Sequence, residues 1–149
     1  MLDIPSSAPD DPSGALVDQV MAVAHLPATA SVAVIGHHTL PLLLALMRRG
    51  CECVRSLRPD MVAPDGEATD LAWIVDVASE DELREALQAA RRRTGASGRV
   101  IVEGMECACR TGLAAVRERA ASAGLDVVSF DHRAGRLVFR PAGSPLQAR

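Results

Sequence analysis

The stretch SVAVIGHHTLPLLLALMRRG, residues 31–50, indicates the fold class because it joins a short apolar strand to a helix. Its first five residues are small or β-branched and lead into Gly36, where the chain turns. Thr39 is suited to cap the helix, and Pro41 lies in the first turn, where its missing N–H costs nothing. The helix is expected to close at Gly50. A strand, a turn and a helix in this order are the unit from which α/β folds are built.

The sequence on both sides of this unit alternates between strand and helix patterns. Ser13 is suited to cap a helix before it, and the S-x-x-E sequence from Ser79 to Glu82 forms a capping box after it. The pattern predicts a helix after Ser79 and another at residues 111–123. Further strands are predicted at residues 51–57, 71–77, 99–103, 125–130 and 136–140. Strands that alternate with helices form a parallel sheet that helices cover on both faces.

The last two predicted strands are separated only by DHRAG, residues 131–135. A parallel crossover needs about a dozen residues or more, so this short turn makes the two strands antiparallel. We therefore expect an α/β fold of three layers. Its six-stranded sheet is mostly parallel, with an antiparallel C-terminal strand and helices on both faces.

The composition fits a single domain, at residues 14–141, between a flexible N-terminal arm at 1–13 and a C-terminal tail at 142–149. All 16 basic residues are arginine, which excludes lysine-based catalysis. A net charge of −3 and 2% aromatic residues argue against nucleic-acid binding. The longest apolar run, residues 40–47, is far short of the roughly 20 residues of a membrane helix. With no signal-like N-terminus, these features predict a cytoplasmic protein with no membrane partner.

Several segments resemble class I S-adenosylmethionine-dependent methyltransferases over most of the chain. AGLDVVSFD, a short turn and GRLVFRP resemble the C-terminal half of that family, and TDLAWIVDV and GRVIVEG are similar to its fourth and fifth strands. LPATASVAVIGHHT stands where the family has its first strand and glycine loop. The resemblance implies a Rossmann-like sandwich. For an active member it implies S-adenosylmethionine held by Gly36, His37, His38 and Glu103, with Asp76 as the general base.

The glycine loop departs from the family pattern. In the methyltransferase loop G-x-G-x-G the glycine positions are Gly36, His38 and Leu40, and the acidic residue two positions before it is replaced by Val34. In the dinucleotide fingerprint G-x-G-x-x-G the last position is Pro41. Because the middle glycine lets the backbone approach the cofactor, the imidazole of His38 is expected to project into that space.

The second strand and the segment after it also differ from the family. Leu57 and Arg58 stand where the family has an acidic residue for the ribose hydroxyls. Only the loop-like residues 58–69 follow, where the family fits a helix, a strand and a second helix. The missing strand would leave residues 51–57 at an edge of the sheet, and an unpaired edge invites a partner.

Three functions of different classes follow from this pattern. We expect a degenerate methyltransferase-like domain, with neither cofactor nor metal, that serves as a binding or assembly module through a homo-oligomer or a protein partner. The first alternative is an active small S-adenosylmethionine-dependent methyltransferase with a remodelled loop, in which Asp76 is catalytic. The second is a nucleotide or dinucleotide binder in which Arg58 meets a phosphate.

Polar residues at the carboxyl ends of the predicted strands define the candidate site. Histidines and carboxylates gathered there are suited to acid–base chemistry or to a metal, whereas the simpler interpretation is an exposed rim of loop residues and helix caps. The residues expected at this edge are His37, His38, Asp76, Ser79, Glu103, Asp131 and His132.

Three further features favour structural roles. The two C-x-C pairs, at residues 51–53 and 107–109, are expected at opposite edges of the sheet, which argues against a shared metal site. The arginine run at residues 91–93 is expected to be a solvated helix end that complements the helix dipole. Trp73 is expected in the core, where its indole N–H needs a partner.

Overall fold

The computed structural model describes residues 12–27, 29–51, 53–58, 68–77, 79–103, 113–131 and 133–142. The described residues form a sheet of six strands in the order β2-β1-β3-β4-β6-β5. The strands are β1 (Ser31–Gly36), β2 (Cys53–Leu57), β3 (Thr69–Val75), β4 (Thr94–Val102), β5 (Leu125–Asp131) and β6 (Arg136–Pro141). β2, β1, β3 and β4 pair in parallel, whereas β6 is antiparallel to both β4 and β5. The mostly parallel sheet with an antiparallel last strand is therefore confirmed.

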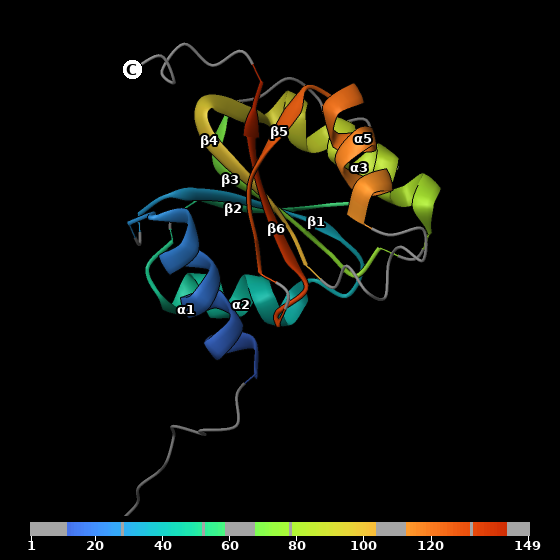
Figure 1. The fold of residues 1–149 in the computed structure, drawn as a ribbon. Coiled ribbons are helices and arrows are strands. Elements are labelled where there is room, and N and C mark those ends of the chain that lie inside the picture. Colours follow the sequence, from blue (N-terminus) through green and yellow to red (C-terminus); the bar gives the residue numbers. More distant parts are fainter. Residues whose placement is uncertain are drawn as a thin grey trace, which may run out of the picture.

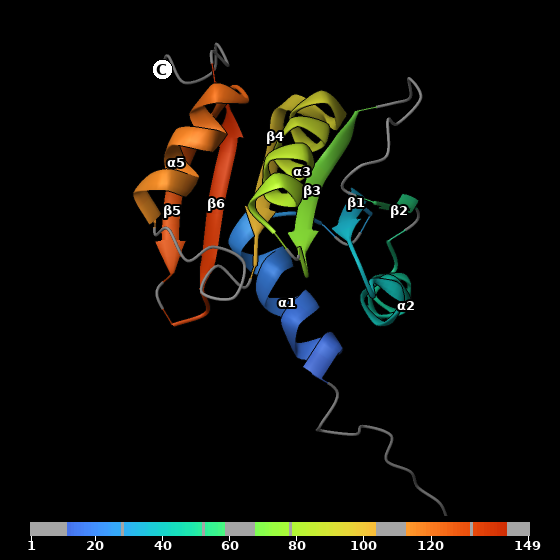
Figure 2. The same cartoon turned by 90° about the vertical axis from the view of Figure 1, so that its right-hand side faces the viewer.

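Helices cover the two faces of the sheet, as Figures 1 and 2 show. α1 (Pro12–Ala24) and α2 (Leu40–Arg48) lie on one face, and α3 (Glu80–Arg93) and α5 (Leu113–Ser122) lie on the other. Each face has its own apolar core, and Trp73 is fully buried in the core under α1 and α2. The expected three-layer sandwich is confirmed.

β2 forms one edge of the sheet, as the sequence predicts. Its neighbour in the sheet is β1, with which it pairs from Ser31↔Cys53 to Ile35↔Leu57. Leu57 is the one buried residue of β2, so this strand is more exposed than β1. Residues 59–67, which link β2 to β3, lie outside the described part of the chain, as do most of the expected terminal arm and tail.

The helix starts differ from the expected caps in two places. α1 begins at Pro12, so Ser13 lies within the helix instead of capping it. The Thr39 side chain makes no capping hydrogen bond to α2, because its hydroxyl lies 2.7 Å from the hydroxyl of Ser56 on β2. By contrast, the Ser79 hydroxyl accepts a hydrogen bond from the Glu82 N–H at 3.1 Å, so the predicted cap of α3 is confirmed.

Two predictions around the start of β4 are wrong. The strand begins at Thr94, five residues before the expected Arg99. Thr94 already pairs with Thr69, and a register shift lies between this pair and Leu71↔Arg99. The arginine run at residues 91–93 is expected to be a solvated helix end, and it does lie in the last turn of α3, but Arg93 is only 5% exposed. The neighbouring Arg91 also departs from that expectation, since its Nε donates to the carbonyl of Gly124.

Candidate functional site

The loops that follow β1 and β3 lie side by side at the carboxyl edge of the parallel strands. β1 and β3 are neighbours, and their pairing ends at Gly36↔Val75. The loop after β1 carries His37 and His38, and Asp76 directly follows β3. Open α/β sheets bind ligands at this edge, so these residues form the candidate site.

Gly36 is required by the close approach of β1 to β3. Its φ of 147° lies outside the range that other residues adopt readily. A Cβ on Gly36 would lie 1.8 Å from the carbonyl oxygen of Val75, a backbone atom that cannot move alone. Strand packing therefore explains this glycine without a cofactor.

Two histidine–carboxylate pairs join the loop after β1 to the β3–α3 segment. His38 Nδ1 lies 2.6 Å from Asp76 Oδ2, and His37 Nε2 lies 3.0 Å from Glu82 Oε2. The rings of His37 and His38 have their centroids 6.4 Å apart. The structure thus brings three predicted site residues, His37, His38 and Asp76, into one cluster with Glu82.

The His38–Asp76 pair is held by unusual backbone conformations at both of its residues. His38 has a φ of 53° and Asp76 a φ of 49°, so both occupy the left-handed region, which few non-glycine residues adopt, although asparagine, aspartate and histidine do so more often than the others. The two side chains are 88% and 55% exposed. A pair this open to water adds little stability on its own. Residues in such conformations are concentrated at functional sites, which makes this pair the centre of the candidate site.

Glu103 and Arg136 form a separate, buried group. Glu103 follows β4, and its carboxylate accepts a hydrogen bond from Nε of Arg136 at the start of β6, with the two side chains only 11% and 3% exposed. Arg136 Nη2 also donates to Gln19 of α1 at 3.2 Å. Burial raises the pKa of Glu103, although Arg136 and, less strongly, the indole of Trp73 act in the opposite direction. The Trp73 N–H still meets no acceptor at hydrogen-bonding geometry among the described residues.

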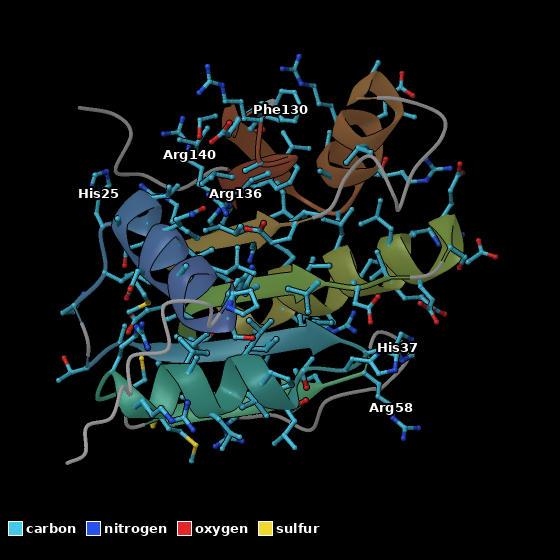
Figure 3. The ribbon with its side chains drawn as sticks, turned by 90° about the horizontal axis from the view of Figure 1, so that it is seen from below. His25, His37, Arg58, Phe130, Arg136 and Arg140 are labelled. Atoms are coloured by element: carbon cyan, nitrogen blue, oxygen red, sulfur yellow. The ribbon has the colours of Figure 1, made fainter. Side chains whose placement is uncertain are left out.

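Arg58 and Asp131 are further predicted site residues that the structure describes. Arg58 follows β2 and is exposed, and Figure 3 shows it at the same end of the sheet as His37, extending away from the ribbon. Asp131 accepts hydrogen bonds from the N–H groups of Arg133 and Ala134 and so stabilises the β5–β6 turn. His132 lies outside the described residues.

The sequence matches no family model and no curated protein, whereas many solved structures share its fold. A TehB-like SAM-dependent methyltransferase from Corynebacterium glutamicum is 17% identical, with 87% of each chain covered and a TM-score of 0.65. DesVI from Streptomyces venezuelae is 12% identical, with 95% of this chain and 100% of that chain covered and a TM-score of 0.67. The magnesium protoporphyrin IX methyltransferase ChlM from Synechocystis, with SAH bound, is 14% identical over 95% and 90%, at a TM-score of 0.59.

The chain has a class I methyltransferase-like Rossmann fold.

Within this methyltransferase-like fold, the sequence alone missed three residues that build the site. Glu82 was predicted only as a capping residue, yet its carboxylate contacts His37. Ser56 and Arg136 lie in strands, and no local pattern in the sequence indicates that they reach Thr39 and Glu103. Such contacts depend on which strands become neighbours, and this is decided by the whole sheet.

The described residues also show the state of two cysteines and the character of the helices. Cys51 is buried and Cys53 exposed, and both are free thiols, while residues 107–109 lie outside the described part. The described residues contain no group of three or more histidine, cysteine or acidic side chains placed to hold a metal. Likewise, none of their helices has both the length and the apolar character needed to cross a membrane.

The raised pKa of Glu103 predicts a pH dependence of stability that the Glu103→Gln variant lacks. A carboxyl whose folded pKa lies above its unfolded value, 4.5, favours the folded state fully below that pH, and this contribution is lost as the pH rises through the folded pKa. We therefore expect the free energy of unfolding of the wild type, minus that of the variant, to fall as the pH rises from about 4 to 8. Urea titrations across this range test it, and a difference that is constant or increases would contradict it.

Proposed function

We propose that the chain is a methyltransferase-like domain that acts as a binding and assembly module and has lost the ability to hold S-adenosylmethionine as the family does. The observation that carries this proposal is the His38–Asp76 pair. It links the loops after β1 and β3 at 2.6 Å, at the edge where sheets of this type bind their ligands.

The position of His38 supports the loss of the cofactor. In the family loop this position is a glycine, whose lack of a side chain lets the backbone approach the ligand. Here an imidazole stands at the same place, and its Nδ1 lies 2.6 Å from the carboxylate of Asp76, which follows β3. The remaining glycine, Gly36, serves the packing of β1 against the Val75 carbonyl.

The end of β2 supports the same proposal. A ribose is usually held by a carboxylate that accepts hydrogen bonds from its hydroxyls. Leu57 and Arg58 occupy this place, and neither side chain is an acceptor. β2 is also an edge strand that is largely exposed, and such an edge is a template for pairing with another chain. The same strand, β2, therefore lacks the ribose-binding carboxylate and presents an exposed edge to which a protein partner can bind.

Thermal shift measurements with S-adenosylmethionine, S-adenosylhomocysteine, NADPH and ATP at millimolar concentration test the proposal. We expect no change in Tm for the wild type, whereas a ligand at a hundred-fold excess over its Kd would add about 2.7 kcal/mol of stability. A rise in Tm with either adenosyl ligand would overturn the proposal in favour of an active methyltransferase. A rise with ATP or NADPH that Arg58→Ala abolishes would overturn it in favour of a nucleotide binder.

The variant His38→Gly shows whether the imidazole itself is the obstacle. Because His38 has a φ of 53°, glycine fits this backbone without strain, and we expect the fold and its Tm to be retained. A gain of S-adenosylhomocysteine binding in His38→Gly, with none in the wild type, would assign the loss to the side chain. Asp76→Asn is the matched control, because it weakens the pair and leaves the ring in place.

A further inference from the structure

An apolar stripe runs along the outer side of α2. Leu40, Leu44 and Met47 are 62%, 44% and 59% exposed, although all three are large hydrophobic residues. Their spacing of four and three residues places them on one side of the helix. The helix buries Leu42, Ala45 and Leu46 on its opposite side, against the sheet. The three side chains of the stripe therefore face away from the core and pack against none of the described elements.

The stripe lies beside the β2 edge of the sheet, where β2 pairs with β1 alone among the described strands. α2 connects β1 to β2 and packs on both, and Figure 2 shows α2 and β2 together at one margin of the molecule. β2 has the sequence CVRSL, with no proline and a single charge at Arg55, so it lacks most of the features that protect an edge strand. We call the stripe and the outer edge of Cys53–Leu57 together the α2–β2 surface.

We propose that the α2–β2 surface joins two copies of this chain into a two-fold symmetric dimer. β2 pairs antiparallel with β2 of the second copy, which continues the sheet across the axis, and α2 packs against α2 of the second copy. This proposal rests on the proposed function as an assembly module and names its partner.

The spacing of the elements fits such a dimer. Paired strands lie about 4.8 Å apart, which places the two-fold axis about 2.4 Å outside β2. A helix seated over β1 and β2 is then about 8–10 Å from its symmetry mate, the distance at which helices pack. Both elements of the surface therefore meet their own copies in a single arrangement, as a two-fold interface requires.

Area and charge favour a second copy as the occupant. A stable interface buries about 800 Å² on each partner, more than a five-residue strand or three side chains supply alone. In the proposed dimer, a second copy of the chain contacts both β2 and the stripe of α2. The three side chains of the stripe are apolar, and the exposed charge beside them is Arg48 in the last turn of α2. Pairing centred on Val54 sets Arg55 opposite Cys53 of the second copy and avoids the repulsion of two arginines.

Sedimentation equilibrium of the full chain tests the proposal, under reducing conditions because Cys53 is an exposed thiol. We expect a dimer for the wild type and a monomer for the Leu44→Glu/Met47→Glu double variant, with the dimerisation constant weakened at least a hundred-fold. Both positions face solvent and glutamate favours helices, so the fold is retained, as circular dichroism checks. Val128→Glu is the matched control, since Val128 is 47% exposed on β5, at the other edge of the sheet, and we expect it to dimerise like the wild type.

Hydrogen exchange supplies the second readout, and the outcomes separate this proposal from the proposed function. In the dimer the amides of β2 exchange more slowly than in the monomeric double variant. A wild type that stays monomeric at millimolar concentration, or a double variant that dimerises like the wild type, would overturn the α2–β2 surface. Either result leaves the loss of cofactor binding intact, because that depends on the thermal shifts with adenosyl ligands. Dissociation by Val128→Glu alone would also overturn it and place the contact on β5.

Discussion

Gly36→Ala is expected to destabilise the fold by about 3 kcal/mol or more. The new Cβ would lie 1.8 Å from the Val75 carbonyl oxygen, so β1 and β3 must separate in the middle of the sheet. The φ of 147° adds strain that glycine alone avoids. Urea denaturation of the purified variant measures the loss, which is expected as a marked shift of the midpoint to lower urea.

Gly95→Ala is the matched control for this effect. Among the described residues, a Cβ on Gly95 would meet only the Cβ of Ala68, at 3.4 Å, which is an ordinary contact. We expect its stability to stay within about 1 kcal/mol of the wild type. Equal losses in the two variants would contradict the packing explanation of Gly36.

Arg136→Met is expected to cost about 3–5 kcal/mol, because it leaves the carboxylate of Glu103 buried without its cation. The two side chains are 3% and 11% exposed, so water cannot replace the lost partner without a change in the structure. Replacement of both, as in Glu103→Leu/Arg136→Met, is expected to recover most of the loss, since it removes the unpaired charge. Chemical denaturation of the two variants at pH 7 provides the comparison.

Arg119→Met is the control for an ordinary ion pair. Arg119 Nη2 lies 2.6 Å from Glu80 Oε1, but the side chains are 31% and 36% exposed. Pairs of this kind contribute about 1 kcal/mol at most. If Arg136→Met were as mild as Arg119→Met, the Glu103–Arg136 pair would not hold α1, β4 and β6 together as the structure indicates.

The fold was largely predictable because its elements carry local signals. The apolar runs of β1 and β3 are wholly consistent with buried parallel strands, and the short turn before Arg136 leaves the last strand no choice but to be antiparallel. The start of β4 was not predictable. Its glycines at residues 95 and 98 are typical of a turn, whereas the strand continues through a register shift.

The candidate site was predictable in place but not in its contacts. Strand ends put His37, His38 and Asp76 at one edge, and the structure confirms that they lie together. The sequence gives no sign that Thr39 turns to Ser56 instead of capping α2, because that choice depends on β2 lying next to β1. The buried contact of Glu103 could not be predicted from nearby residues either, because its partner, Arg136 of β6, lies 33 residues along the chain.

Calorimetric titration of the full chain with S-adenosylhomocysteine tests the central claim most directly. The claim is that His38 and Asp76 occupy the edge of the sheet where the family holds its cofactor, and that the chain has given up that ligand. We predict no saturable heat of binding up to millimolar concentration. One-to-one binding with a micromolar Kd, weakened by a bulky replacement of Asp76, would contradict the claim and make this chain a candidate methyltransferase.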